Sequence, residues 1–490
     1  MTAIDRRSFL TRGAALACAS AVSTLALGRL YAQSAWAAGR SGLARGKGGY
    51  GPLARRTALN EPGGPEYLAL PEGFSYVVFG KTGDPMTDGT LTPQAHDGMA
   101  AFARPGGRVR LIRNHEVRNA PGDFTLAVVV PPEPNSAKYD PLAVGGTVSL
   151  DFDVASMSLE RDFVSQAGSI VNCAGGIMLG QSGWITSEET TAGPNEGWAE
   201  RHGYNFPVPV NADGPVFSRP LTAMGRFAHE AVAADPRTGL VYETEDSGDD
   251  SGFYRFTPND PHNLSAGGRL EMLGIEGYNG YNTLTGQVVG RPLPVKWVPI
   301  RNADPDLEAG ARPVAIQGIA AGAAFFNRLE GIWWGGDRCL FNSTSGGNAH
   351  LGQVWEYRPS SGGGILTLVY ESTGIDPNVG RPPLDSPDNL TITPRGGVLL
   401  CEDDSNANPE ATGDTHPLAP GIIDVNRLIG LADDGQPFEF AVNTFSNSEF
   451  AGACFAPNAR DVLFVNIQGF NVPGTGMTFA VTGPWRQGAL

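Results

Sequence analysis

Positive charge, long apolar runs and closely spaced cysteines are all scarce in this 490-residue chain. Lys and Arg number 35 against 51 Asp and Glu, which gives a formal net charge of −16. This balance argues against nucleic acid as a partner and suits divalent cations better. After the N-terminal segment, no stretch approaches the ~18 to 20 apolar residues that a membrane span needs. No C-x-x-C pair occurs, so cysteine spacing does not distinguish bridges from free thiols.

The N-terminal sequence has the pattern of an export signal. Arg6-Arg7, followed by Phe9-Leu10, has the spacing of a twin-arginine motif, and an apolar run leads to Ala35-Trp36-Ala37, an A-x-A cleavage pattern. An ordinary secretory signal is the alternative. We predict a signal peptide over residues 1–37, the twin-arginine translocase as a partner, and a periplasmic or secreted protein. Residues 38–64, rich in Gly and Arg, are expected to form a flexible leader before a catalytic domain over residues 65–490.

A short phrase recurs along the rest of the chain: a Gly/Pro turn, four or five β-branched or apolar residues, then carboxylates or amides. The copies span residues 104–116, 180–189, 235–246, 394–404 and 457–468. The 66 Gly and 38 Pro of the whole chain favour many turns and few long helices. Copies at unequal spacing predict an all-β protein, a β-propeller with irregular loop insertions.

In a propeller, acids at matching strand ends converge on one axis. Like charges a few ångströms apart raise one another's pKa or require a cation, and hard cations with oxygen ligands satisfy that requirement. For any single copy, a solvated loop tip is the simpler interpretation. The recurrence within one chain favours a metal cluster.

Several segments resemble the PhoX-type alkaline phosphatases. The resemblance extends from about residue 65 to the C-terminus in the same order, and it is carried by residues 224–230, 242–246, 326–331, 386–390, 449–455, 464–468 and 482–485. It implies a six-bladed propeller, exported by the twin-arginine route. It also implies a cluster of Fe3+ and Ca2+ in the channel that hydrolyses phosphate monoesters of small phosphorylated substrates. We expect a monomer.

The resemblance also implies site residues. Cys173 is the expected thiolate ligand of iron, because a soft thiolate suits iron and not calcium. The expected carboxylate ligands are Glu116, Glu188 or Glu189, Glu230, Glu245, Glu402 and Asp388. Adjacent acids such as Glu188 and Glu189 cannot both point inward from a regular strand, since side chains alternate faces.

Three further residues are expected to act on the substrate. Arg328 is the candidate phosphate clamp, because a guanidinium pairs with two phosphate oxygens at once. Glu330 would hold Arg328 or bind metal, and Asn114 would orient a ligand or contact phosphate. A surface ion pair between Arg328 and Glu330 is the alternative. The implied reaction is metal-assisted in-line attack on phosphorus, with Arg328 stabilising charge on the equatorial oxygens.

One segment departs from the family's pattern. Residues 343–350 are rich in amides and hydroxyls where an acid is expected, so one calcium site would be altered or lost. Two other functions stay open: a calcium-dependent propeller that hydrolyses lactones or similar esters, and a non-catalytic propeller stabilised by calcium. Neither would need the Cys173 thiolate or the Arg328 clamp.

Overall fold

The computed structural model describes residues 49–490 except 125–129, 131–136, 218, 377–379, 404–414, 433–434, 460 and 471–473. The predicted signal peptide and residues 38–48 of the predicted leader lie outside the described residues. Within them, strands dominate and α2 (Val314–Ala320) is the one α-helix. No helix in this part of the chain has the length and apolar character needed to cross a membrane.

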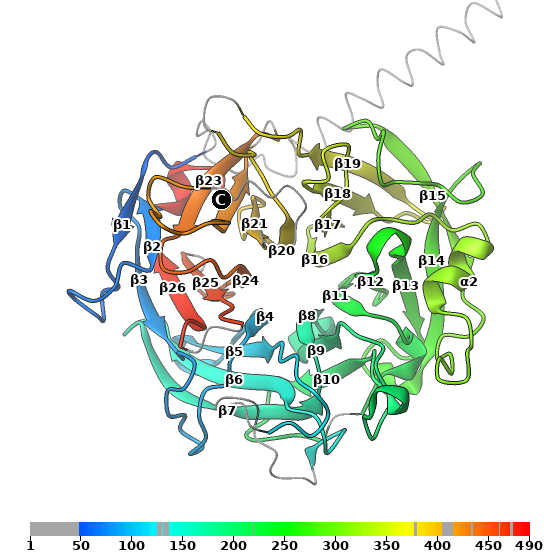
Figure 1. Ribbon diagram of the computed structural model, residues 1–490, viewed down its shortest axis with the longest axis horizontal. Helices are drawn as coiled ribbons and strands as arrows, with labels where there is room; N and C mark the ends of the chain where they lie inside the picture. The colour runs from blue at the N-terminus through cyan, green and yellow to red at the C-terminus, as the bar shows by residue number, and fades with distance from the viewer. Residues whose placement is uncertain are drawn as a thin grey trace, which may run out of the picture.

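The strands form antiparallel series around a central axis, so the prediction of an all-β propeller is confirmed (Figure 1). The first series is β4 (His96–Ala103), β5 (Arg108–His115), β6 (Gly145–Asp153) and β7 (Ser158–Ser169). The second is β8 (Asn172–Ile177), β9 (Gly183–Glu188) and β10 (Asn205–Pro209). The third is β11 (His229–Ala234), β12 (Val241–Glu245), β13 (Phe253–Pro258) and β14 (Gly268–Ile275).

The fourth series is β16 (Leu329–Gly335), β17 (Arg338–Ser343), β18 (Gln353–Arg358) and β19 (Ile365–Glu371). Strand β15 (Pro292–Pro299) pairs with both β14 and β19, and so joins the third and fourth series into one nine-stranded sheet. The fifth series is β20 (Pro387–Ile392), β21 (Val398–Glu402), β22 (Arg427–Leu431) and β23 (Pro437–Asn443). The sixth begins with β24 (Phe450–Phe455), β25 (Val462–Ile467) and β26 (Met477–Thr482).

The N-terminal strands close the ring. Strand β3 (Ser75–Phe79) adds to β26, so the sixth series combines both ends of the described chain. Strands β2 (Leu68–Pro71) and β1 (Leu53–Arg56) add to the outer edge of the fifth series. The structure therefore corrects the predicted leader from residue 49 onward: Leu53–Arg56 is paired strand, and the Tyr50 hydroxyl donates to the carbonyls of Trp485 and Leu490.

The hydrophobic core lies between neighbouring sheets. The largest cluster, between the fifth and sixth series, includes Leu428, Phe440, Leu463 and Phe479, all fully buried. Each strand alternates such residues with others that face the next sheet, as sheets covered on both faces require. This packing fixes the first strand of every series, β4, β8, β11, β16, β20 and β24, around the axis.

Candidate metal centre

Five of these innermost strands carry a β-bulge at the same place. In β4, His96 pairs with His115 and Met99 with Arg113, so that two residues, Asp97 and Gly98, lie opposite one. The bulge interrupts the alternation of side chains and re-aims the first bulged residue. That residue carries a carboxylate or a thiol in all five strands: Asp97, Cys173, Glu230, Glu330 and Asp388.

Small residues after these side chains let the inner strands approach closely. A Cβ on Gly98 would lie 2.5 Å from the Ala174 Cα, and a Cβ on Gly331 would lie 2.9 Å from the Asn389 Cα. Both glycines directly follow a bulged acid. The ring of inner strands is therefore narrow enough for side chains from different blades to meet.

A second tier of polar residues comes from the segment after each second strand. In every series, the first residue of this tier donates its N–H to the carbonyl of the residue just before the inner strand, over 2.9–3.2 Å. These residues are Glu116, Glu189, Asp246, Thr344, Asp403 and Gln468. Thr344 thus stands in the fourth series at a position where four others have an acid.

The two tiers converge in one chain of possible ligands. There are four groups, each with ligand atoms within 4.8 Å of one another, and successive groups are joined in turn by Cys173, Glu230 and Asp388. We call their nine residues the axial cluster: Asp97, Glu116, Cys173, Glu189, Glu230, Glu330, Asp388, Asp403 and Glu449. Glu449 directly precedes β24, whose own bulge falls on Gly452 and Ala453.

The cluster is mostly buried and strongly acidic. Both carboxylate oxygens of Glu230 and Oδ1 of Asp97 are buried without a hydrogen-bond partner. Burial, reinforced by neighbouring carboxylates, raises the pKa of Glu230 and Asp97 well above the usual range, and burial with Asp403 nearby raises the pKa of Asp388 to about 7. Such groups are stable as ions only when a cation compensates them. The donor set fits hard cations, with one thiol able to bind a softer one.

Two arginines stand at the rim of the cluster. Nη2 of Arg118 forms ion pairs with Glu116 and Glu189. Nη2 of Arg328 lies 2.9 Å from Oε1 of Glu330 and 3.0 Å from Oδ2 of Asp246. Their side chains are 46% and 41% exposed, so each guanidinium faces both the cluster and solvent.

Three of the glutamates predicted as possible ligands lie outside the axial cluster. Glu188, Glu245 and Glu402 each end a second strand, one residue before the second tier, and therefore point to the opposite face. Glu188 accepts hydrogen bonds from the N–H groups of Ile170, Gly203 and Tyr204. Glu245 accepts from the Gly252 N–H and the Tyr254 hydroxyl, and Glu402 from the Asp385 N–H and the Arg427 guanidinium.

The hydrogen bonds of Asn114 also differ from the phosphate contact predicted for this residue. It lies opposite the β4 bulge, and its Nδ2 donates to the carbonyls of Cys173, over 3.0 Å, and Ala174, over 2.6 Å. Its Oδ1 accepts from the Trp184 indole N–H. Asn114 therefore holds the backbone at Cys173 and Ala174.

Sequence reasoning missed Asp97, Asp403, Glu449 and both Arg118 and Asp246. Asp97 lies in a bulge, which no alternation pattern places, and Asp403 and Asp246 each follow a glutamate that was chosen instead. A usable signal was present in the repeated phrase: where it ends in two adjacent acids, as in Glu402-Asp403, the second one reaches the axis.

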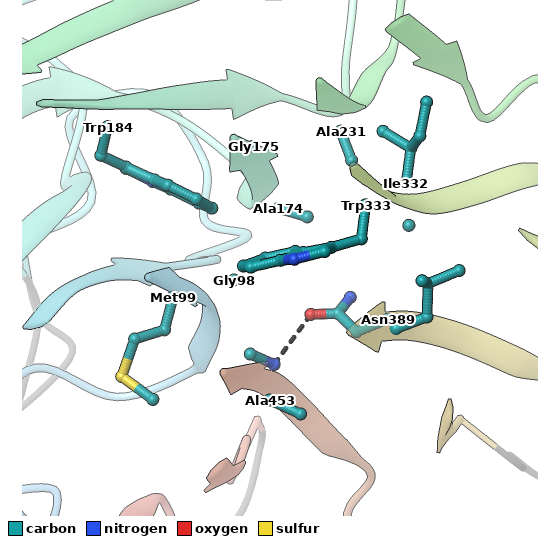
Figure 2. A pocket seen from close by; sticks show the side chains of 13 residues that line it. Gly98, Met99, Ala174, Gly175, Trp184, Ala231, Ile332, Trp333, Asn389 and Ala453 are labelled. Atoms are coloured by element: carbon teal, nitrogen blue, oxygen red, sulfur yellow. Dashed lines mark hydrogen bonds between the residues drawn. The ribbon is translucent and has the colours of Figure 1, made fainter. Parts of the chain in front are cut away.

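Beneath the cluster the axis is nearly filled. A cavity of about 20 Å³ is ringed by the residues that follow the bulged acids and thiol, among them Gly98, Ala174, Ala231 and Asn389. Figure 2 shows the Trp333 indole from β16 lying across this ring. Trp333 lies on the same inner strand as Glu330, three residues further along, and lines this cavity. Arg118 and Arg328 at the rim are partly exposed to solvent.

Comparison with known proteins identifies a matching family model and similar solved structures. Residues 48–471 match the sequence model described as alkaline phosphatase PhoX. Pseudomonas fluorescens PhoX, solved in complex with the transition-state analogue vanadate, is 17% identical with a TM-score of 0.63, over 90% of this chain and 99% of that chain. A Dyadobacter fermentans protein of unknown function is 9% identical with a TM-score of 0.43, over 84% of this chain and 100% of that chain. Comparison with curated proteins gives no match.

Proposed function

The chain belongs to the alkaline phosphatase PhoX family, and from this premise we propose that it hydrolyses phosphate monoesters at the axial cluster with calcium and iron bound. The observation that carries the proposal is Glu230: both of its carboxylate oxygens are buried without a hydrogen-bond partner, in a group with Cys173 and Glu189. Buried charge of this kind is retained where it binds a cation.

The donor sets divide the cluster between the two metals. The groups Asp97–Glu116–Cys173 and Cys173–Glu189–Glu230 share the thiol and would hold iron. The groups Glu230–Glu330–Asp388 and Asp388–Asp403–Glu449 offer oxygen alone and would hold calcium. Bound cations supply Lewis-acid catalysis and neutralise the phosphate dianion.

Arg328 orients the substrate. Its bonds to Asp246 and Glu330 use Nε and Nη2, which leaves Nη1 of this half-exposed side chain for a phosphate oxygen. Glu330 and Asp246 fix the plane of the guanidinium, so its fork of donors is set before the substrate arrives. Glu330 thereby links the substrate clamp to the metal-binding groups.

We infer that substrate reaches the cluster from one side of the axis only. Trp333 fills the axis on one side, so substrate enters and product leaves on the side of Arg118 and Arg328. Two guanidiniums above a strongly acidic cluster attract a phosphate dianion to a site that would otherwise repel it. The substrates are small phosphorylated molecules, and the enzyme acts as a monomer outside the cytoplasm after twin-arginine export.

A paired substitution tests the proposal. Glu230→Gln keeps the size of the side chain and removes its charge, and we expect p-nitrophenyl phosphate hydrolysis to fall at least ~100-fold, a loss of the size reported for groups that support a metal. Glu271→Gln is the control, because Glu271 is also a buried glutamate but is bonded to Arg255 and lies on β14, away from the axis. Wild-type turnover by Glu230→Gln would contradict the proposal.

A further inference from the structure

Four of the inner strands are directly preceded by a residue in the left-handed region of backbone space. Their φ angles are +54° at Ala95, +49° at Val171, +37° at Arg328 and +40° at Ser386. Left-handed geometry costs an L-residue roughly 1–2 kcal/mol, and for a β-branched residue such as Val171 it is a genuine outlier. Strain of this kind persists only where surrounding contacts enforce it.

Each strained residue lies two positions before a member of the axial cluster. The members reached in this way are Asp97, Cys173, Glu330 and Asp388. The carbonyl of each strained residue accepts the N–H of the second-tier residue of the same blade, over 2.9–3.0 Å. The left-handed turn therefore sets the backbone of both tiers at once.

A side chain from the neighbouring strand holds each turn. It belongs in every case to the residue that pairs with the first residue of the inner strand, and it binds the backbone just before the strained position. His115 Nδ1 donates to the Gln94 carbonyl over 2.8 Å, and the Ser343 hydroxyl donates to the Asn327 carbonyl. Glu188 accepts from the Ile170 N–H over 3.1 Å, and Glu402 from the Asp385 N–H over 2.9 Å.

These four side chains, His115, Glu188, Ser343 and Glu402, we call the latches. All are buried, and the two glutamates are held in turn by charged partners. Glu188 lies 2.6 Å from His202 Nδ1, and Glu402 accepts from Nε and Nη2 of Arg427 over 2.7 Å each. Their chemistry differs between blades, from imidazole to hydroxyl to carboxylate, yet the position and the bonded backbone are the same.

The third series provides an internal contrast. Glu245 occupies the latch position but bonds to Gly252 and Tyr254, not to the backbone before β11. Ala228, the corresponding residue before β11, is not among the residues with positive φ in the described chain. Where the latch is absent, the strained turn is absent too.

We infer that the four latches are positioning residues of the metal centre. They hold strained turns that fix the ligands of both tiers in a binding arrangement before a cation arrives. This inference rests on the proposed function, since it assigns the latches a purpose only if the axial cluster binds metal. Residues that orient ligands through hydrogen bonds affect metal affinity by about 10- to 100-fold.

Glu188→Gln is the primary test, because a carboxamide of the same size cannot accept all of the N–H donors around Glu188. In the full-length protein we expect iron affinity, measured by competition with a chelator, to fall about 10-fold or more. Calcium binding, measured by calorimetry, should weaken as well. Glu271→Gln is the control and should bind both metals as the wild type does. Ser343→Ala removes a single hydroxyl bond, so it serves if Glu188→Gln fails to fold, and it should weaken calcium binding several-fold.

A substitution that relieves the backbone strain at Val171 distinguishes a positioning role of the latches from a role in overall stability. Glycine adopts positive φ without penalty, so Val171→Gly should restore much of the iron affinity lost in Glu188→Gln. Wild-type metal affinity in both Glu188→Gln and Ser343→Ala, with only a lower melting temperature, would overturn the inference. Failure of Val171→Gly to restore iron affinity would also count against it. If the wild-type protein itself bound no metal, the proposed function would fail first, and the two failures are thereby distinguishable.

Discussion

Asp388→Asn should stabilise the metal-free protein and weaken its metal binding, two effects of opposite sign from one substitution. Burial and the neighbouring Asp403 raise the pKa of the folded-state carboxyl from 3.8 to about 7. The folded protein therefore holds a proton that the unfolded chain releases between these pH values, and stability falls as pH rises from about 4 to about 7. At roughly 1.4 kcal/mol per pKa unit, the ionised carboxyl costs about 4 kcal/mol at pH 8. The asparagine variant does not carry this cost.

The assay is chemical unfolding of chelator-treated protein at pH 5 and pH 8. We expect Asp388→Asn to exceed the wild type by up to about 4 kcal/mol at pH 8, and by much less at pH 5, where the wild-type carboxyl is protonated. With calcium added, the order should reverse, because the variant lacks a ligand and gains less from binding. A metal-free variant no more stable than the wild type at pH 8 would refute the reasoning that the cluster is a set of buried, uncompensated charges.

Three further substitutions probe separate parts of the site. Cys173→Ala should lose iron while retaining calcium and its fold, by elemental analysis and calorimetry; a variant with full iron content would remove the thiolate from the metal centre. Arg328→Lys should raise KM for p-nitrophenyl phosphate about tenfold, since a single ammonium cannot keep the bonds to Asp246 and Glu330 and also present a further donor to phosphate in a fixed plane, and an unchanged KM would exclude the clamp. Burial lowers the pKa of His202, but Glu188 and Asp140 outweigh it and raise that pKa to about 9. The protonated imidazole therefore contributes its full stabilisation of the fold below about pH 6.5, and this stabilisation disappears as pH rises through 9. His202→Gln should therefore lose up to roughly 3 kcal/mol near pH 6, and little above pH 9; a pH-independent difference in unfolding free energy would contradict this.

The fold could be predicted from the sequence because the chain repeats one structural unit. Turn, apolar strand and acidic end recur in five copies, and recurrence in one chain predicts blades without any knowledge of pairing. The closure of the ring was not accessible. Strand β3 pairs with β26 across some 400 residues, and no local pattern indicates that pairing.

The site was predicted only in part, for a reason of geometry. Glu116, Cys173, Glu230 and Asp388 were predicted as ligands and lie in the axial cluster, as do Glu189 and Glu330. Glu402 was chosen over Asp403 because alternation shows that one of two adjacent acids faces inward but not which one. Asp97 depends on a bulge, and bulges follow from three-dimensional packing that the sequence expresses only indirectly.

The latches show why neighbouring glutamates were attractive candidates. Glu188 and Glu402 are fully buried acids beside true cluster members, so their burial and spacing resemble those of ligands. Their oxygens are instead occupied by backbone N–H groups and by His202 or Arg427. Besides the face to which they point, these partners distinguish Glu188 and Glu402 from Glu230, whose two carboxylate oxygens have no hydrogen-bond partner.

Metal content and activity measured on one preparation test the central claim most directly. Protein purified from its exported form should contain iron and calcium together, and its hydrolysis of p-nitrophenyl phosphate should disappear on calcium removal and return when calcium is restored. Calcium without iron, in a protein inactive toward p-nitrophenyl phosphate, would contradict the account of the axial cluster as a phosphatase centre.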